Sequence, residues 1–291
     1  MKNSAVPGTS VVITGATSGI GFATVRKFLD AGSFVIGVGR SAERNHASQI
    51  ALQADRLEGK AEFVLGDLSA IDQVRQTARV IKRLLHQNGY KKLDILVNNA
   101  GVYLEKKQMT EDNIEKTFAV NHLAPFLMTH ELMPLLSQSK LNRVLTVTSY
   151  SHRTTPLCLN RITNPKPYIG LLAYKRSKLC NILFSQALNR KQGVIKAVAV
   201  DPGLVNTGIA SKENQGISDW IWRIKRHNGV SADVPAEMIF KLACAQSMDY
   251  PEGLYYKDHQ FLQPSRAARR EDLADALWSL SCRLTGIVWR S

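Results

Sequence analysis

A tyrosine and a lysine stand four residues apart in the segment AYKRSKLCN, residues 173–181. Four residues make about one helical turn, so Tyr174 and Lys178 share one face if the segment is helical. An ammonium group beside a phenol stabilises the phenolate and so lowers the pKa of the phenol. The spacing therefore fits two interpretations: a chance pair on the surface, or a proton donor whose acidity the lysine adjusts.

A glycine-rich segment, TGATSGIG (14–21), predicts a second functional element. Gly15, Gly19 and Gly21 allow a tight turn and let a phosphate approach the backbone. The segment joins a predicted strand to a predicted helix, and the N–H groups at a helix N-terminus attract phosphate. We expect a pyrophosphate-binding loop, and the alternative is a glycine-rich turn without a ligand. The other members of this loop are Thr17, Ser18 and Ile20.

The end of the second predicted strand, GVGRSAER (37–44), indicates which dinucleotide would bind. NAD needs an acidic side chain here for the ribose 2′-hydroxyl, whereas NADP needs a cation for the 2′-phosphate. Gly39 stands in the acidic position, Arg40 follows it, and Arg44 comes one turn later. An arginine fork binds phosphate strongly. The sequence therefore favours NADP(H) over NAD(H), unless Arg40 only extends into solvent at the strand end.

The third predicted strand ends in GDLS (66–69), which contains Asp67 and Leu68. The Asp67 carboxylate could accept a hydrogen bond from an adenine amino group, or it could cap the next helix. The two roles are compatible.

Apolar runs alternate with amphipathic stretches along the whole chain, which predicts a parallel sheet covered by helices on both faces. We expect a single α/β domain over 1–291, a doubly wound Rossmann-type fold with six or seven strands. Its ligands would bind beyond the carboxyl ends of the strands. The expected strands are 10–15, 33–40, 61–67, 93–101, 143–149, 194–200 and 254–257, and the expected helices are 19–31, 42–58, 70–87, 110–136, 171–191 and 267–284.

Two irregular segments, 150–170 and 204–230, are long for a compact domain and are expected to form substrate loops. The first would place Tyr150 or His152 near the reacting group. In the second, Trp220 and Trp222 would form a lid over the substrate or anchor a helix on the core.

Composition excludes several classes of protein. The net charge of +14 is spread along the chain and comes without a zinc-finger or RNA-binding signature, so we expect a solvated surface and no nucleic acid. Weak contact with a membrane surface stays open. The histidines lack metal-ligand spacing, and no apolar run is long enough to span a bilayer. The four scattered cysteines argue against a disulfide framework and suit the cytoplasm.

Five ordered motifs, which cover nearly the whole chain, resemble the short-chain dehydrogenase/reductase family. They are TGATSGIG, NNAG (98–101), Asn121 in AVNHLAPF, Ser149 in LTVTSYS, and YKRSK (174–178). Three further segments resemble the retinol-dehydrogenase-like branch, which includes the WW-domain-containing oxidoreductase. These are SYSHR (149–153), LAYKRSKLCNILFS (172–185) and LWSLSCRLTG (277–286).

The resemblance implies four catalytic residues. Tyr174 would exchange a proton with the substrate oxygen, and Ser149 would hydrogen-bond that oxygen. Lys178 would lower the pKa of Tyr174 and hold the nicotinamide ribose. Asn121 would support a water that links Lys178 to solvent.

The resemblance also implies cofactor contacts beyond the glycine loop. The small residues after the fourth strand would let the cofactor lie close to it, and a Pro-Gly turn would contact the nicotinamide amide. These residues are Asn98, Ala100, Gly101, Pro202, Gly203 and Thr207, together with Tyr174 and Lys178. The branch commonly has a histidine before the Pro-Gly pair, whereas this chain has Asp201.

The expected function is hydride transfer between NADP(H) and a carbonyl or alcohol group of a small lipophilic substrate, such as a retinal-, steroid- or aldehyde-like molecule. Two alternatives remain: a cofactor-binding regulator without turnover, and a peripheral membrane binder. The expected assembly is a monomer or homodimer.

Overall fold

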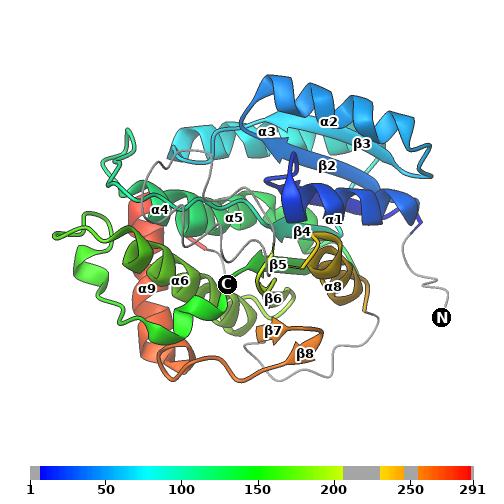
Figure 1. The fold of residues 1–291 in the computed structure, drawn as a ribbon. Coiled ribbons are helices and arrows are strands. Elements are labelled where there is room, and N and C mark those ends of the chain that lie inside the picture. The colour runs from blue at the N-terminus through cyan, green and yellow to red at the C-terminus, as the bar shows by residue number, and fades with distance from the viewer. Residues whose placement is uncertain (1–6, 206–229, 246–254, 290–291) are drawn as a thin grey trace.

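The computed structural model describes residues 7–205, 230–245 and 255–289, and the strands in these ranges form one sheet (Figure 1). The strand order is β3-β2-β1-β4-β5-β6-β7-β8, and all neighbouring pairs are parallel except β7 with β8. The strands are β1 Ser10–Thr14, β2 Phe34–Gly39, β3 Lys60–Leu65, β4 Ile95–Asn98, β5 Arg143–Val147, β6 Lys196–Asp201, β7 Tyr255–Lys257 and β8 Gln260–Phe261.

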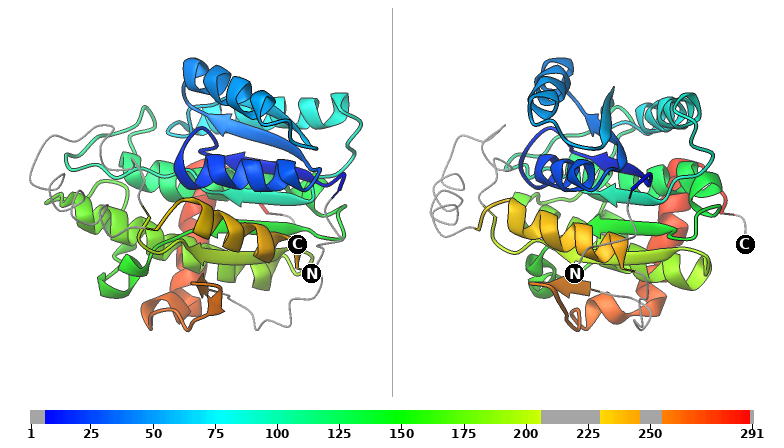
Figure 2. Two further views of the ribbon diagram at one scale, coloured as in Figure 1. Left: turned by 45° about the vertical axis from the view of Figure 1, so that its right-hand side comes forward. Right: turned by 90° about the vertical axis from the view of Figure 1, so that its right-hand side faces the viewer.

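Helices cover both faces of the sheet, which confirms the predicted α/β architecture. In the left view of Figure 2, α1 (blue) and α8 (gold) lie in front of the sheet and α9 (red) lies behind it. The core on the far face is formed with α3, α5 and α6, and α9 packs against α6. The helices are α1 Gly19–Asp30, α2 Ala42–Ala54, α3 Ile71–Gln87, α4 Lys116–Phe118, α5 Ala124–Leu136, α6 Gly170–Lys191, α8 Asp233–Cys244 and α9 Glu271–Thr285.

Two elements were not expected, namely helix α8 and the eighth strand. β8 has two residues and pairs antiparallel with β7 (Tyr256↔Phe261, Lys257↔Gln260). A strand of that length carries no readable alternation of apolar and polar residues, so the sequence pattern could not reveal it.

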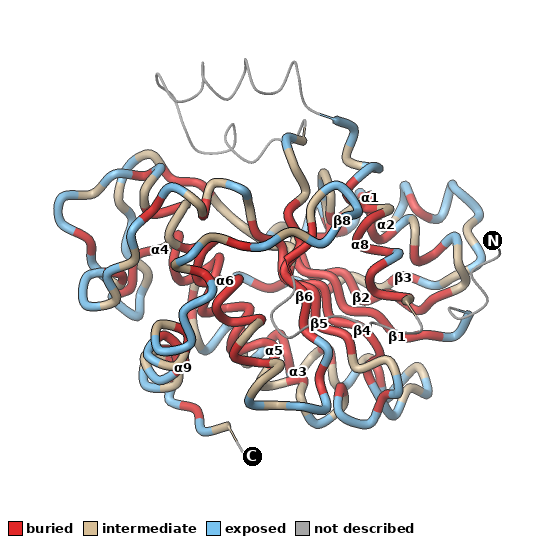
Figure 3. Tube along the Cα trace, turned by 90° about the horizontal axis from the view of Figure 1, so that it is seen from below, coloured by how far each residue is buried: buried red, intermediate tan, exposed pale blue. Residues whose placement is uncertain are grey.

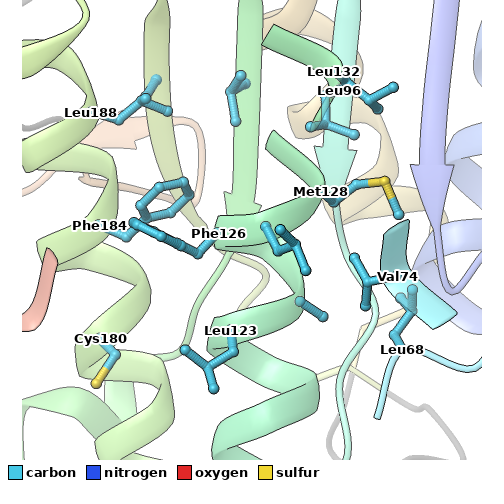
Figure 4. Close-up of a cluster of buried hydrophobic side chains, with 14 of the residues drawn as sticks. Leu68, Val74, Leu96, Leu123, Phe126, Met128, Leu132, Cys180, Phe184 and Leu188 are labelled. Atoms are coloured by element: carbon cyan, nitrogen blue, oxygen red, sulfur yellow. The ribbon is translucent and has the colours of Figure 1, made fainter. Parts of the chain in front are cut away.

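The central strands are buried along their length, as the tube in Figure 3 shows. The cluster in Figure 4 joins side chains of α5, such as Phe126, to side chains of α6, such as Phe184. The two rings pack edge to face with centroids 5.5 Å apart. Cys180 lies in the same cluster and is fully buried. This packing sets the position of α6, which carries the tyrosine and the lysine.

The helix expected over 110–136 is interrupted. It begins at Lys116, because the Glu115 carboxylate accepts hydrogen bonds from the backbone N–H groups of Thr117 (2.9 Å) and Phe118 (2.9 Å). A π-helical turn, Ala119–Leu123, then separates α4 from α5. Pro125 has no N–H to donate to the carbonyl four residues earlier, so the regular hydrogen-bond ladder cannot run through this point.

Candidate active site

A cavity of about 990 Å³ opens at the carboxyl ends of the strands, where the fold predicts a ligand. Its lining includes both the glycine loop and the Tyr174–Lys178 pair, which lie far apart in the sequence. The predicted residues that line it are Gly15, Thr17, Ser18, Gly19, Ile20, Arg40, Asp67, Leu68, Ala100, Gly101, Ser149, Tyr174, Lys178, Pro202 and Gly203. Thr207 and most of the segment 204–230, including Trp220 and Trp222, fall outside the described residues.

The loop between β1 and α1 forms one end of the cavity. Gly15 has a φ of 67°, and a Cβ atom there would lie 3.0 Å from Asn99 Nδ2. Gly21, by contrast, does not line the cavity. A Cβ atom at this position would lie 2.2 Å from the carbonyl oxygen of Gly15. Gly21 allows α1 to pack on the loop, so its role is close packing rather than direct contact with a ligand.

Gly39 cannot be replaced by an acidic residue without rearrangement, because a Cβ atom would lie 2.1 Å from Asn45 Oδ1. The cavity wall beyond it consists of Arg40, Ser41, Glu43 and Arg44. Ser41 caps α2 by accepting a hydrogen bond from the Arg44 N–H at 3.3 Å. Two cations, a hydroxyl group and the Glu43 carboxylate therefore follow Gly39, the position at which NAD-binding proteins carry an acidic residue. Ser41 was not predicted, although its place before a helix was a readable signal.

Asp67 lines the cavity and does not cap α3. Its carboxylate accepts a hydrogen bond from the Ser69 N–H at 2.9 Å. The residue before α3 is Ala70, and the N–H of Ile71 donates to Asp112 instead. The capping interpretation of Asp67 is therefore wrong, because the chain makes a turn between the carboxylate and the helix.

Asn98 requires a correction, because its side chain does not line the cavity. It donates a hydrogen bond to Thr129 Oγ1 at 3.2 Å, toward α5. The neighbouring Asn99 lines the cavity, and its Nδ2 donates to the carbonyl oxygens of Thr14 (2.9 Å) and Gly15 (3.3 Å). Successive side chains of a strand point to opposite sides, and the sequence NN did not reveal which of the two asparagines faces the cavity.

Tyr174 and Lys178 occupy one wall at the other end of the cavity. They are 8% and 2% exposed, which rules out a chance surface pair. The Lys178 ammonium donates a hydrogen bond to the carbonyl oxygen of Val147 at 3.0 Å and lies 5.6 Å from the centre of the Tyr174 ring. α6 thus brings acid and cation together beside the end of β5.

Burial dominates the ionisation of this pair. Burial, together with the negative charge of Asp201, raises the pKa of Tyr174 to about 12, although a hydrogen bond with Ser149 lowers it. Burial lowers the pKa of Lys178 to about 8, and Asp201 opposes that change. The expected fall of the Tyr174 pKa toward neutrality is therefore absent, because loss of water and the nearby Asp201 charge both disfavour the phenolate.

Ser149 follows β5, and its backbone is fixed by a hydrogen bond from His152. His152 is fully buried, and its Nδ1–H donates to the carbonyl oxygen of Ser149 at 2.8 Å. Its Nε2 accepts a hydrogen bond from the Ser265 N–H at 3.1 Å. Burial lowers the pKa of His152, so the ring stays neutral with its proton on Nδ1. Of the two candidates in this segment, Tyr150 lines the cavity and His152 supports Ser149.

Asn121 lies in the π-helical turn and is fully buried behind the cavity wall. Its Oδ1 accepts from the Val102 N–H at 2.7 Å, and its Nδ2 donates to Ser177 Oγ at 2.9 Å. A Cβ atom on Gly101 would lie 3.4 Å from both Asn121 Oδ1 and Lys178 Nζ. Asn121 and Lys178 therefore both lie beside Gly101, although Asn121 does not itself line the cavity.

The described residues contain neither a metal-binding cluster nor a membrane-spanning helix. No group of three or more histidine, cysteine, aspartate or glutamate side chains in the described ranges is placed to hold a metal ion. None of the helices within the described part of the chain has the length and apolar character needed to cross a bilayer.

Comparison with known proteins places these motifs in a family. The family model described as short chain dehydrogenase matches residues 9–218. Retinol dehydrogenase 12 of Mus musculus is 34% identical over 289 residues, which cover 99% of this chain and 89% of that protein. The WW domain-containing oxidoreductase of Gallus gallus is 33% identical over 288 residues, which cover 95% of this chain and 68% of that protein.

Solved structures share the fold. An uncharacterized protein from Mycobacterium paratuberculosis has a TM-score of 0.73 at 27% identity, with 98% of this chain and 97% of that chain covered. The NADPH-bound carbonyl reductase from chicken fatty liver has a TM-score of 0.66 at 18% identity, with 89% and 99% covered. The chain therefore belongs to the short-chain dehydrogenase family of oxidoreductases, in the branch of the retinol dehydrogenases and the WW domain-containing oxidoreductase.

Proposed function

We propose that this protein transfers a hydride between NADP(H) and the carbonyl or alcohol group of a small lipophilic substrate. The observation that carries the proposal is the shared cavity. One end holds Tyr174, Lys178 and Ser149, and the other end holds the glycine loop and Arg40.

The cofactor end suits NADP better than NAD. Gly39 carries no carboxylate that could bind a ribose 2′-hydroxyl, and Arg40 with Arg44 offers cations for a 2′-phosphate. The chicken carbonyl reductase, which shares the fold, is an NADPH complex, whereas a short-chain dehydrogenase from Burkholderia phymatum is an NAD complex. The fold thus accommodates both, and the residues at the end of β2 support NADP.

Side chains of this protein would carry out the proton transfer. The cofactor supplies or accepts the hydride when it is bound. Tyr174 donates its phenolic proton to the substrate oxygen during reduction and takes it back during oxidation. Ser149 hydrogen-bonds the same oxygen, and the Lys178 ammonium stabilises the phenolate. Asn121, behind Gly101, would order a water that connects Lys178 to solvent.

A lipophilic substrate fits the side chains around Tyr174. Tyr103 packs against the Tyr174 ring with centroids 6.0 Å apart, and Leu171 lies one turn before it on α6. Leu204 follows the Pro-Gly turn, and all three residues line the cavity. Apolar walls with a few polar groups at the reacting centre are typical of small-molecule sites.

The test is a panel of aldehydes and ketones, run with NADPH and then with NADH, in which the absorbance of the reduced nicotinamide is followed. We expect turnover with lipophilic members of the panel and a preference for NADPH of about tenfold or more in kcat/KM. NADPH binding without turnover of any carbonyl would instead support the regulatory alternative. Equal use of the two cofactors would overturn the assignment of Arg40.

A further inference from the structure

Asp201 is a buried carboxylate at the catalytic end of the cavity. It ends β6, lines the cavity and is 1% exposed. Its Oδ1 accepts a hydrogen bond from the Gly203 N–H at 2.9 Å, and its Oδ2 accepts one from the Tyr255 hydroxyl group. Burying a carboxylate is costly unless it is hydrogen-bonded and has a countercharge.

The sheet register brings Asp201 close to Lys178. Val200 of β6 pairs with Val147 of β5, and the carbonyl oxygen of Val147 accepts the hydrogen bond of the Lys178 ammonium. Alternation along β6 places Asp201 on the same face as Ala199, which belongs to the core shared with α6. The carboxylate is therefore directed to the side of the sheet on which α6 carries Lys178.

The cavity has an uneven distribution of negative charge. Three acidic residues line it in the described part of the chain, namely Glu43, Asp67 and Asp201. Glu43 lies on α2 and Asp67 follows β3, both at the cofactor end. Asp201 alone among these three lies at the catalytic end, next to two ionisable groups of the reaction.

We propose that Asp201 is the buried countercharge of Lys178 and a positioning residue that keeps the lysine an ammonium in the pH range of turnover. The inference rests on the proposed function, in which that ammonium stabilises the Tyr174 phenolate. The pKa directions agree with this inference. The pKa of Lys178 is lowered to about 8 by burial, and the negative charge of Asp201 acts against that lowering. The pKa of Tyr174 is raised by burial and also by the negative charge of Asp201. Removing the carboxylate should lower both pKa values.

Other ionisable groups surround Asp201. β7 contributes Tyr255 and Lys257, and Lys257 is paired with Asp258 at 3.2 Å. The short 3-10 helix Tyr150–Thr154 contributes His152, which is neutral, and Arg153, which donates a hydrogen bond to the carbonyl oxygen of Gln263. From α6 come Tyr174 and Lys178 themselves. Within the described residues, none of these neighbours supplies a second carboxylate to Lys178.

The test compares Asp201→Asn with Tyr255→Phe. The first removes the charge and keeps an oxygen for the Gly203 N–H, whereas the second removes the Tyr255 hydrogen bond and keeps the charge. In the cofactor-free protein, NMR of lysine labelled at the ε-carbon follows the titration of Lys178. We expect its pKa to be lower in Asp201→Asn than in the wild type, and to stay near the wild-type value in Tyr255→Phe.

The pH profile of kcat/KM for carbonyl reduction is the second readout. In Asp201→Asn we expect the alkaline limb to move to lower pH, with a loss of about three- to tenfold near pH 8 and less than about twofold near pH 6. In Tyr255→Phe we expect an unmoved limb, even if the overall rate falls. A purely structural role of Asp201 would lower the rate equally at both pH values.

An unchanged Lys178 titration in a folded Asp201→Asn protein would overturn the inference. If that variant does not fold, Asp201→Ser, whose hydroxyl can still accept from Gly203, is the second neutral variant for the same titration. A wild-type protein that turns over no carbonyl would refute the proposed function alone, because the NMR titration tests Asp201 without any reaction.

Discussion

The two ends of the cavity differ in the physical character of the groups that line them. The cofactor end combines backbone shaped by glycines with charged side chains that remain in contact with solvent, such as Arg40. The catalytic end consists of ionisable side chains almost without solvent contact: Tyr174, Lys178 and Asp201. A phosphate can be held by exposed charges, whereas a proton donor with a shifted pKa requires removal from water.

The difference also explains where substitutions should be tolerated. At the cofactor end, crowding is the constraint, since a Cβ atom at Gly39 would overlap Asn45 Oδ1. At the catalytic end the constraint is charge balance, since Lys178 is buried and Asp201 acts on it. Changes at the cofactor end should therefore alter affinity, and changes at the catalytic end should alter rate and pH dependence.

The largest expected effect is at the catalytic end. Tyr174→Phe removes the proton donor, so carbonyl reduction should fall by about a thousandfold. NADPH affinity should change by less than about threefold, since the cofactor end is untouched. Single-turnover kinetics and NADPH fluorescence titration measure the two quantities. Tyr150→Phe is the matched control, because Tyr150 also lines the cavity but has no place in the proton transfer. Equal losses in both variants would show that the acid is misassigned.

Acid should weaken the fold behind the catalytic end. Burial lowers the pKa of His122 to about 3, and this ring lies beside Asn121 with its Nε2 2.9 Å from Ser281 Oγ. The unfolded chain takes up a proton at a pKa of about 6.5 and the folded chain does not, so stability is lost as pH falls below that value. Between about pH 7.5 and pH 5 this group should reduce the free energy of unfolding by about 2 kcal/mol.

Urea unfolding at the two pH values measures this effect. His122→Gln, whose amide can still donate to Ser281, should be less stable than the wild type at about pH 7.5 but should lose less stability on acidification. His86→Gln changes an exposed histidine of α3 and should leave the pH dependence unchanged. A wild-type pH slope in His122→Gln would show that another group is responsible.

A smaller effect is expected at the cofactor end. Arg40→Asp should raise the KM for NADP by about tenfold or more, with little change in kcat at saturation, because it exchanges attraction for repulsion of the 2′-phosphate. Steady-state kinetics with NADPH and NADH measure the change in preference. Arg79→Asp makes the same change of charge on the exposed surface of α3. If both variants lose affinity equally, the general positive field of the protein and not Arg40 holds the phosphate.

Several parts of the fold and the site could be predicted because they depend on local sequence. Runs such as SVVIT of β1 are apolar throughout, which marks strands buried on both faces. The glycine loop was readable because its turn needs residues without side chains. The four-residue spacing of Tyr174 and Lys178 was readable because a helix repeats about every four residues.

Other parts depend on contacts between segments distant in the sequence. Which of the two asparagines faces the cavity depends on the orientation of β4 between the glycine loop and α5. The support of Ser149 by His152 depends on the segment that carries Ser265.

The sequence by itself determined most of the alternating strands and helices, the glycine-rich turn after β1 and the one-turn spacing of Tyr174 and Lys178, since each follows from neighbours within a few residues. Only the tertiary structure decided the electrostatics of the site. Burial raises the pKa of Tyr174 and lowers the pKa of Lys178, and the negative charge of Asp201 raises both. The pairing of β5 with β6 places Asp201 at this end of the cavity. The physical reason is that desolvation depends on everything that packs around a group, and a local pattern contains no record of that surrounding.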